Sequence, residues 1–513
     1  MVKVALVRPP ALMSKGTLQG PLTPPIGPAY LAGSLRAAGH DAIVVDALGE
    51  APFHSEPCFE ERMTALGLPI ADIVARIPGD ARVIGVSCMF SQDWPHTRRL
   101  IAAIRQEFPH ALIVAGGEHI TALAAYTLET CPEVDICALG EGEETIVEIA
   151  DGVADGRDLS QLRGVALRRD GRAIVTAARA RLKHLEEIAP PAWDLTPIAN
   201  YLDHNLGYGV DRGRSMPILA TRGCPYQCTF CSSPTMWTPR YYARDPAHVL
   251  DEIQSYIDRE RVTNIDFYDL TAIVKKKWVL EFCDLVERRG MKFTWQLPSG
   301  TRSEAIDAEV CRALYRAGCR NISYAPESGS PAVLERIKKK VKLPNLMASM
   351  RGAIRECMNV KTNIIVGFPD ETRGEVWQTI GFVARMALAG VHDVSVSMFS
   401  AYPGSELFDE LTASGLLPKL DDEYFLSLAS YTDVTSTIGW CANLSNRELG
   451  ILRILALLTF YGLQYAARPW RLLRTIYNVA SHRQESRLDK SLLDYFDRKR
   501  GAKAATAQVR VLG

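Results

Sequence analysis

Short runs of β-branched residues alternate with amphipathic helical stretches through the first 150 residues. The apolar runs that predict strands are 3–7, 41–47, 82–89 and 111–117, and a further strand opens the stretch 134–153. The helical patterns between them cover 28–40, 94–109 and the region around 121–130. This alternation predicts an α/β domain with a parallel, doubly wound, Rossmann-like sheet. Ligands of such sheets bind beyond the carboxyl ends of the strands, which here are the loops 7–12, 87–92, 116–121 and 140–144.

The same alternation resumes after residue 216. Six apolar runs predict strands, at 217–223, 264–269, 292–298, 321–328, 361–369 and 393–404. Helical patterns separate and follow them, at roughly 246–260, 276–289, 305–317, 331–340, 345–358 and 373–389. Six consecutive strand–helix units predict a partial TIM-like (β/α)6 barrel, whose active site would lie at the carboxyl ends of its strands.

A chain of 513 residues is too long for one hydrophobic core, so several domains are expected. The Pro- and Trp-containing segment 186–201 begins the expected linker, which extends to residue 215. The predicted division is a first domain with its connecting segment at 1–185, the linker at 186–215, the barrel at 216–420 and a C-terminal helical region at 421–513.

Charge and targeting signals add little to this picture. Lys plus Arg and Asp plus Glu number 59 each, so the average surface gives no argument for nucleic acid as a partner. The N-terminus lacks the features of a signal peptide, and no stretch reaches the roughly 18 apolar residues of a spanning helix. We therefore expect a cytoplasmic protein without a transmembrane segment, in which clustered cysteines serve as metal ligands or catalytic thiols.

The segment 451–479 is apolar at first and then basic. Arginines recur there at helical spacing beside large apolar residues: Arg468, Arg471 and Arg474 next to Trp470, Leu472 and Leu473. Two interpretations stay open. One is an interfacial helix that makes weak membrane-surface contact or covers a lipid-like substrate. The other is an amphipathic helix that packs on the barrel with its arginines in solvent.

Cys224, Cys228 and Cys231 follow the first predicted barrel strand with the spacing Cys-x3-Cys-x2-Cys. Four thiolates would complete a structural zinc or iron–sulfur site, whereas three leave one iron of a [4Fe-4S] cluster without a protein ligand. An open iron can bind a small molecule. The alternatives are three unrelated loop cysteines, or a zinc site that takes its fourth ligand from a distant His or Cys.

This triplet resembles the hallmark of the radical S-adenosylmethionine (SAM) enzymes. The resemblance implies that the three cysteines hold a [4Fe-4S] cluster whose fourth iron binds the amino and carboxylate groups of SAM, and that one electron then cleaves SAM to a 5′-deoxyadenosyl radical. The residues it points to as SAM-binding are Phe230, Asp269, Arg302, Glu327 and Ser328. The stretch 366–372 resembles an adenine-contacting strand end of that family.

The first domain has no G-x-G-x-x-G after its first strand, which disfavours a nicotinamide or flavin site. Joined to such a barrel, it resembles a cobalamin-binding domain. The residues that carry this resemblance are Pro9, Pro10, Ser87, Gly116, Gly117, His119, Gly140, Glu141 and Gly142. The loop after the first strand lacks the His that ligates cobalt in many cobalamin proteins, which leaves the lower axial ligand unassigned. His119 better suits the corrin edge or tail, and a relic domain that binds nothing is the alternative.

The whole chain is thus similar to the cobalamin-binding radical SAM family. This resemblance implies an enzyme that takes electrons from an external low-potential donor and methylates an unactivated carbon of a small, natural-product or lipid-like molecule. Relatives such as the anaerobic magnesium-protoporphyrin monomethyl ester cyclase imply an alternative, radical cyclisation or rearrangement without methyl transfer. A third hypothesis is an iron–sulfur binding protein without turnover. No general acid–base pair is recognisable, and Asp269, Trp295, Tyr324 and Tyr402 are candidates for lining the substrate cavity.

Overall fold

The computed structural model describes the chain except for residues 15, 18–21, 432, 434–436 and 497–513. Its first domain is built on a seven-stranded sheet in the order β10-β9-β8-β7-β6-β1-β3. Five of these strands run parallel: β3 (Asp41–Asp46), β1 (Lys3–Arg8), β6 (Val83–Ser87), β7 (Leu112–Gly116) and β8 (Ile136–Ala138). These are the strands that the apolar runs predict, and their doubly wound order confirms the expected fold class.

Helices cover this sheet on both faces. They are α1 (Ile26–Ala37), α2 (Ala47–Glu50), α3 (Ile70–Arg76), α4 (Trp94–Glu107), α5 (Glu118–Ala122), α6 (Ala124–Thr130) and α7 (Glu143–Asp155). The expected helix around 121–130 is divided at Leu123 into α5 and α6. Helix α7 ends where Gly156 takes a left-handed conformation, φ 68°, which only glycine adopts without strain.

Two additions to the first domain were not expected from the sequence. The antiparallel strands β9 (Val165–Arg169) and β10 (Arg172–Val175) extend the sheet at one edge. A separate three-stranded sheet consists of β2 (Ala11–Ser14), β5 (Met63–Leu66) and β4 (Ser55–Cys58). The connecting segment of this domain therefore completes its sheet.

The second domain is a six-stranded parallel sheet in the order β11-β14-β15-β16-β17-β18. Its strands are β11 (Ser215–Ile218), β14 (Asn264–Phe267), β15 (Thr294–Thr301), β16 (Cys319–Glu327), β17 (Asn359–Val366) and β18 (Asp393–Met398). Among the described residues β11 and β18 do not pair with each other, so the barrel is open. This confirms the partial (β/α)6 barrel.

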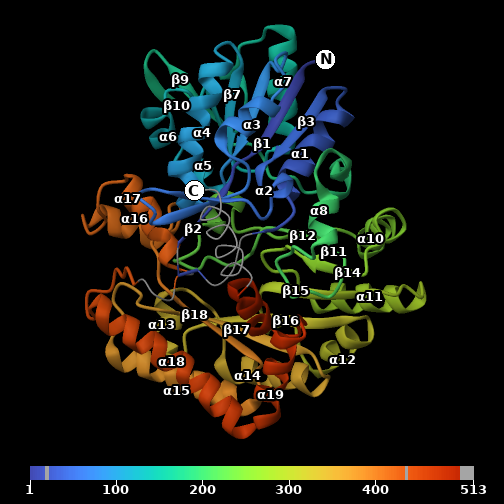
Figure 1. The fold of residues 1–513 in the computed structure, drawn as a ribbon, viewed down its shortest axis with the longest axis vertical. Helices are drawn as coiled ribbons and strands as arrows, with labels where there is room; N and C mark the ends of the chain where they lie inside the picture. The colour runs from blue at the N-terminus through green and yellow to red at the C-terminus, as the bar shows by residue number, and fades with distance from the viewer. Residues whose placement is uncertain (15, 18–21, 432, 434–436, 497–513) are drawn as a thin grey trace, which may run out of the picture.

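The outer layer of the barrel consists of helices that follow the strands as expected. They are α10 (Pro246–Glu260), α11 (Lys276–Arg288), α12 (Ala308–Arg316), α13 (Pro331–Arg336), α14 (Leu343–Arg355) and α15 (Arg373–Ala389). The region beyond the barrel is helical, also as expected, with α16 (Glu406–Ala413), α17 (Asp422–Ser427), α18 (Asn446–Ala467) and α19 (Pro469–Ala480). Figure 1 shows the first domain above the barrel. Helices α15, α18 and α19 lie at the bottom of this view, on the side of the barrel that faces away from the first domain.

The two domains share one apolar core. A single cluster of buried side chains includes Val7 and Trp94 of the first domain together with Phe368, Phe399 and Phe425 of the barrel and the helical region. The linker adds polar contacts through α8 (Ile198–Asp203), where the Tyr201 hydroxyl donates a hydrogen bond of 2.7 Å to Asp46. The domains are therefore fixed relative to each other, with the carboxyl ends of both sheets face to face.

Helix α18 is long and apolar enough to cross a membrane by length and composition, which the sequence expectation did not allow for. Its inner face nevertheless belongs to the barrel, because Arg453 donates to the carbonyl of Val396 and Gln464 donates to the carbonyl of Val391. Both side chains are buried against the barrel. An arginine is rare in a membrane-spanning helix, because a charged side chain is costly inside the bilayer. We therefore assign α18 to the outer layer of the barrel.

Helix α19 turns Arg471 toward the barrel, and Arg468 just before it does the same, which contradicts the interpretation of a packed helix with its arginines in solvent. Arg471 donates hydrogen bonds to the carbonyls of Gly390 and Val391, at 3.0 and 3.1 Å, and Arg468 donates to the carbonyl of Ala387 at 3.2 Å. These arginines satisfy the carbonyls that the C-terminus of α15 leaves without helical partners. The apolar side chains consequently point outward, and Trp470 and Leu473 are 61% and 68% exposed.

Candidate active site

A cavity of about 460 Å³ lies where the carboxyl ends of the two sheets meet. The first domain contributes the loops after β6 and β7, with Phe90, Ser91 and His119 among the lining residues. The barrel contributes the loop of the three cysteines and the ends of β15 to β18. The cavity therefore occupies the position in which both folds place their ligands.

The three cysteines lie on a loop that begins after the short strand β12 (Thr221–Arg222), which pairs with β13 (Tyr242–Ala243). The loop leaves β12 at Gly223, whose φ of 82° and close approach to the carbonyl of Arg240 require glycine. Backbone hydrogen bonds then fix it from two sides. Thr229 N–H donates to the carbonyl of Ile337 at 3.1 Å, and the carbonyl of Thr229 accepts from Leu407 N–H at 2.9 Å.

Cys224, Cys228 and Cys231 all line the cavity. Burial raises the pKa of each thiol, that of Cys231 to about 12, while nearby Lys339 lowers the pKa of Cys224 and Cys228. Among the residues described, no three His, Cys, Asp or Glu side chains converge as a single metal ion requires. A [4Fe-4S] cluster fits this donor set better than zinc, because each thiolate then binds a different iron.

Arg302 and Phe230 flank the cysteine loop inside the cavity. The Arg302 guanidinium lies 3.5 Å from the centre of the Tyr226 ring and forms a 2.6 Å ion pair with Glu304. Phe230 packs its ring 5.8 Å from that of Phe368, centre to centre. Both residues therefore line the cavity, with the Arg302 charge next to the cysteine loop.

Glu327 ends β16 and also lines the cavity. Its φ of 66° is unusual for a residue with a side chain and costs free energy, a feature that is concentrated at functional sites. The carboxylate forms a 2.9 Å ion pair with Lys339, and both side chains are only 9% exposed. The cavity thus contains a buried pair of opposite charges beside Cys228.

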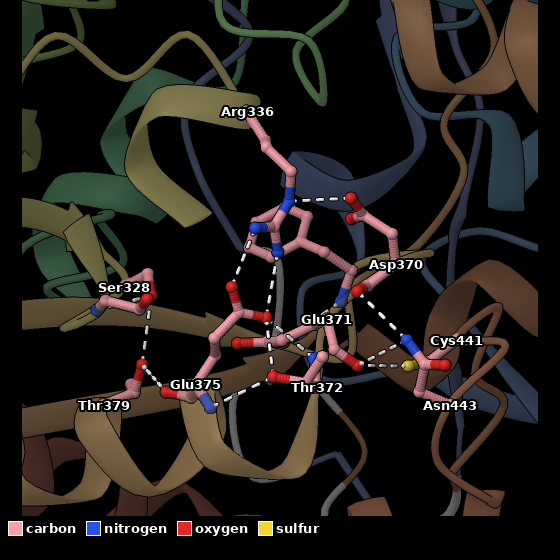
Figure 2. Close-up of polar contacts among 11 residues, drawn as sticks. Ser328, Arg336, Asp370, Glu371, Thr372, Glu375, Thr379, Cys441 and Asn443 are labelled. Carbon is pink, nitrogen blue, oxygen red and sulfur yellow. Dashed lines mark hydrogen bonds and ion pairs between the residues drawn. The ribbon is translucent and has the colours of Figure 1, made fainter. Parts of the chain in front are cut away.

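Ser328 and Asp269, two other expected SAM contacts, do not line the cavity. The Ser328 hydroxyl forms a hydrogen bond of 3.0 Å with that of Thr379 on α15. Figure 2 shows these two side chains facing each other. Gly329 approaches the backbone of α15 so closely that a Cβ would collide with it, so its small size serves helix packing. Asp269 accepts a hydrogen bond from the Thr221 hydroxyl, and burial raises its pKa to about 6. The residues that reach the cavity beside it are Leu270 and Thr271.

The loop after β17, residues 367–372, is stabilised by one of its own side chains. The Glu371 carboxylate accepts hydrogen bonds from the backbone N–H of Gly367 at 2.6 Å and of Phe368 at 3.2 Å. Burial raises the pKa of Glu371 to about 7. Figure 2 shows Arg336 of α13 reaching over this loop to Asp370 and Glu375. Asn363, Ile364 and Ile365 of β17 line the cavity, whereas no residue of 366–372, the stretch that resembles an adenine-contacting strand end, is among its lining residues.

His119 is the one expected cobalamin residue that lines the cavity. Its Nδ1 lies 2.9 Å from the Ser91 hydroxyl and its ring stacks on Trp94 at 4.9 Å. Burial lowers the pKa of His119 to about 3, so the imidazole is neutral at physiological pH. Its Nε2 is buried without a hydrogen-bond partner in the described structure. Glu118, which the sequence did not single out, accepts a hydrogen bond from Ser232 in the cysteine loop.

The other expected cobalamin residues lie at the carboxyl edge of the first sheet without lining the cavity. Ser87 and Gly116 are paired at the ends of β6 and β7, and Pro9 and Pro10 follow β1 in buried positions. Gly117 and Gly140 form turns at positive φ, a conformation that favours glycine. Gly142 is the residue directly before α7. Glu141 instead forms ion pairs with Arg181 at 2.7 Å and Arg222 at 3.3 Å, and so connects the first domain to the barrel.

The candidate substrate residues divide in two. Tyr402 lines the cavity, whereas Trp295 and Tyr324 are buried in the barrel core. There the Trp295 indole donates a hydrogen bond to the carbonyl of Ala317, and the Tyr324 hydroxyl is hydrogen-bonded to that of Ser349. Sequence reasoning missed several cavity residues, among them Met89, Asn363, Ser397, Ser400 and Lys339. Four of them fall inside the runs that predict strands, at 82–89, 361–369 and 393–404, so their place on these strands is the one signal that could have found them. Lys339 gave no such signal, because a run of lysines normally marks a solvated surface.

Comparison with known proteins assigns both domains. Residues 19–150 match the B12 binding domain and residues 218–383 match the radical SAM superfamily. The matches confirm both parts of the expected resemblance and, with them, the expected cofactors: cobalamin for the first domain, a [4Fe-4S] cluster and SAM for the barrel.

Related chains are similar to this one over most of its length. An uncharacterized methyltransferase of Pyrococcus horikoshii is 28% identical over 81% of this chain and 84% of its own length. The anaerobic magnesium-protoporphyrin IX monomethyl ester cyclase of Cereibacter sphaeroides is 28% identical over 76% of this chain and 60% of its own length. The cytidylyl-2-hydroxyethylphosphonate methyltransferase of Streptomyces wedmorensis is 25% identical over 82% of this chain and 84% of its own.

Solved structures agree with the fold. The methyltransferase TsrM from Kitasatospora setae, with cobalamin and a [4Fe-4S] cluster bound, superposes with a TM-score of 0.62 over 81% of this chain and 78% of its own, at 17% identity. The cobalamin-dependent enzyme OxsB, with aqua-cobalamin and SAM bound, gives a TM-score of 0.66 over 99% of this chain and 81% of its own, at 12% identity. At such identities the likeness concerns the arrangement of the domains.

Proposed function

We propose that this chain, in which a B12-binding domain is joined to a radical SAM domain, is a cobalamin-dependent radical SAM enzyme that methylates an unactivated carbon of a small molecule. The observation that carries the proposal is the shared cavity. His119 of the first domain and the three cysteines of the barrel line the same 460 Å³ space. Two cofactors held at these positions would act on one substrate placed between them.

Each cavity residue has a role in this proposal. Cys224, Cys228 and Cys231 would bind the cluster, and Phe230 would exclude water from it. Arg302 would pair with the carboxylate of SAM, and Glu327 would accept hydrogen bonds from its ribose or amino group. When bound, the reduced cluster supplies the electron that cleaves SAM, and cobalamin supplies the methyl group.

His119 would contact the edge or tail of the corrin. Because burial lowers its pKa to about 3, it would do so as a neutral group that offers one N–H and one lone pair. Ser91 fixes the orientation of the ring through Nδ1, which leaves Nε2 for the cofactor. The eight remaining expected residues at the sheet edge would shape the groove for the cobalamin tail: Pro9, Pro10, Ser87, Gly116, Gly117, Gly140, Glu141 and Gly142. Asp269 and Ser328 would support the SAM site from behind, by holding Thr221 and α15.

The decisive experiment uses SAM labelled with a deuterated methyl group. Reconstituted, reduced enzyme is incubated with candidate small molecules, and the products are analysed by mass spectrometry. We expect a product that carries the deuterated methyl group, together with 5′-deoxyadenosine and S-adenosylhomocysteine. A converted product without label would contradict methyl transfer and favour cyclisation or rearrangement, which the similarity to the cyclase of Cereibacter sphaeroides makes the second candidate. Absence of both 5′-deoxyadenosine and any converted product would favour the non-catalytic hypothesis.

The outward apolar side chains of α18 and α19 support a proposal about location. We infer that the enzyme is cytoplasmic, takes electrons from an external donor and touches the membrane surface weakly through these helices. Ile451 and Leu458 of α18 and Trp470, Leu473 and Ile476 of α19 are all more than half exposed. Trp470 and Tyr477 are the side-chain types that favour the interface between lipid and water. Such contact suits a lipid-like substrate.

A further inference from the structure

An open groove of about 1630 Å³ runs between α15 and the segment that joins α13 to α14. Much of its lining is apolar, but the charged residues in it are nearly all basic: Lys338, Lys340, Lys342, Arg351 and Arg385 are exposed, and Lys339 is buried. Glu335 is the one acidic side chain among the described residues that line it. This concentration of positive charge stands out on a chain whose acidic and basic residues are equal in number.

Most of this charge is not neutralised within the protein. Arg336, next to the groove, is paired with Asp370 and Glu375, as Figure 2 shows, and Lys338 pairs with Glu406 at 2.7 Å. By contrast, the structure as described gives no ion pair to the four remaining exposed cations: Lys340, Lys342, Arg351 and Arg385. A surface that keeps four unpaired cations in one groove attracts an anionic partner over a distance.

The floor of the groove is also the wall of the active site. Lys339 lines both the groove and the cavity, and its ammonium lies 5.9 Å from the centre of the Phe230 ring. The carbonyl of Ile337 accepts the hydrogen bond from Thr229 N–H, between the second and third cysteines. A molecule in the groove is therefore separated from the cysteine loop by one layer of protein.

The size of the groove selects a macromolecular partner. A volume of 1630 Å³ exceeds the roughly 300–1,000 Å³ that pockets for small ligands have, and the groove is wide open to solvent. Its position on the outer face of the barrel also separates it from the substrate cavity. An acidic protein surface matches both its dimensions and its charge.

We propose that this groove is the docking surface of an acidic protein that carries a low-potential iron–sulfur or flavin centre. This inference rests on the proposed function, because it assumes a cluster at Cys224, Cys228 and Cys231. In each encounter the donor centre is oxidised by one electron and the [4Fe-4S] cluster is reduced by one. The electron crosses the layer formed by residues 337–339 and the cysteine loop.

The test compares two matched charge-reversal variants of the reconstituted enzyme. The groove variant is Lys340→Glu/Lys342→Glu. The control is Arg169→Glu/Lys292→Glu, which reverses two exposed cations without a described ion pair, on β9 and just before β15, away from the groove. A reduced plant-type [2Fe-2S] ferredoxin serves as the acidic donor. Calorimetry measures its binding, and stopped-flow absorbance measures the rate of cluster reduction, each at several salt concentrations.

We expect the groove variant to bind ferredoxin at least tenfold more weakly and to be reduced at least tenfold more slowly, and the control to stay within twofold of the wild type. Binding by the wild type should weaken as salt rises. Equal binding and equal reduction rates in the groove variant, or wild-type binding that ignores salt, would overturn the docking surface.

A chemical reductant separates this inference from the proposed function. With dithionite, which needs no docking, the wild type and both variants should form 5′-deoxyadenosine at similar rates. If the wild type forms none with dithionite, the proposed function fails. If it does, and the groove variant alone loses its response to ferredoxin, the groove is the entry point for electrons. Thermal unfolding of both variants checks that they are folded.

Discussion

Ser232, the residue directly after the third cysteine, donates a hydrogen bond to the carboxylate of Glu118, the residue directly before His119. This one contact joins the loop expected to hold the cluster to the loop expected to face the corrin. Because burial raises the pKa of Glu118, the carboxylate depends on this partner more than an exposed group would. The contact therefore ties the two loops to each other.

We therefore predict that Glu118→Ala uncouples radical formation from methyl transfer. The variant should still form 5′-deoxyadenosine but yield about tenfold less methylated product per SAM cleaved, since the corrin loop loses its anchor. Liquid chromatography of both products measures this ratio. Glu118→Gln, whose amide oxygen still accepts from Ser232, is the matched control and should stay close to the wild type. An unchanged ratio in Glu118→Ala would show that the contact does not position the cofactors.

The cysteine triplet gives a prediction about iron. Cys228→Ser should abolish the absorption of a [4Fe-4S] cluster and reduce iron content after reconstitution by more than half, since a two-thiolate site binds a cluster poorly. Cys357→Ser is the control, because Cys357 is exposed and lies outside the cavity. Iron assay and absorption spectra of anaerobic protein provide the measurement. Equal iron in both variants would remove the cluster from this loop.

The buried ion pair between Lys339 and Glu327 gives a prediction about stability. Lys339→Met leaves the Glu327 carboxylate unpaired in a site that is 9% exposed, and breaking a buried pair in this way costs about 3–5 kcal/mol. The double variant Lys339→Met/Glu327→Gln removes both charges and should recover most of the loss. Thermal unfolding of the three proteins measures the difference. A double variant as unstable as the single one would mean that Lys339 acts through packing.

Glu371 should make stability depend on pH. Its pKa in the folded chain is raised to about 7, so between about pH 4.5 and pH 7 the folded state holds a proton that the unfolded state has released. Its contribution to stability is therefore largest below this window and falls as pH rises through it, by about 1.4 kcal/mol per pH unit. Glu371→Gln lacks this titrating group. The unfolding free energy of the variant minus that of the wild type should therefore rise as the pH increases from about 4.5 to 7. A constant difference would contradict the raised pKa.

The exposed apolar face of α19 predicts weak binding to lipid. The wild type should float with liposomes that contain anionic lipid, and Trp470→Glu/Leu473→Glu should reduce the floating fraction at least fivefold, because both side chains point into solvent. The same two substitutions should leave thermal stability nearly unchanged, since neither side chain is packed. Wild-type protein that stays in the lower fraction at low salt would exclude membrane contact.

Elements with strong periodicity could be predicted from the sequence almost completely. The runs around Val83–Ser87 and Leu112–Gly116 are strands buried in a parallel sheet, and such strands are continuous apolar runs. The strand Ser55–Cys58 could not be predicted, because its residues are largely exposed and it is held by its neighbour β5. Its structure depends on tertiary pairing, which a local pattern does not contain.

The location of the candidate site could be predicted from the sequence, but the direction in which its side chains point could not. The cysteine spacing pointed to the loop, and the resemblance to the radical SAM family pointed to Arg302 and Glu327, which both line the cavity. The sequence could not tell which way a strand-end side chain points, so Asp269 and Ser328 were expected in the cavity although they hydrogen-bond to Thr221 and Thr379 behind it. Lys339 was missed for a related reason, since only the fold shows that one lysine in a solvated run turns inward.

The apolar core that runs without a break from the first sheet into the barrel has an evolutionary consequence. Because this core fixes the separation between the two cofactor sites, a descendant of this enzyme can acquire a new substrate without rebuilding either of them. Asn363 of β17, Ser397 of β18 and Ser400 after β18 line the cavity and are not part of this core, so a change of side chain there alters the shape and polarity of the cavity. Divergence of specificity is thus confined to a few replaceable surface positions of the cavity.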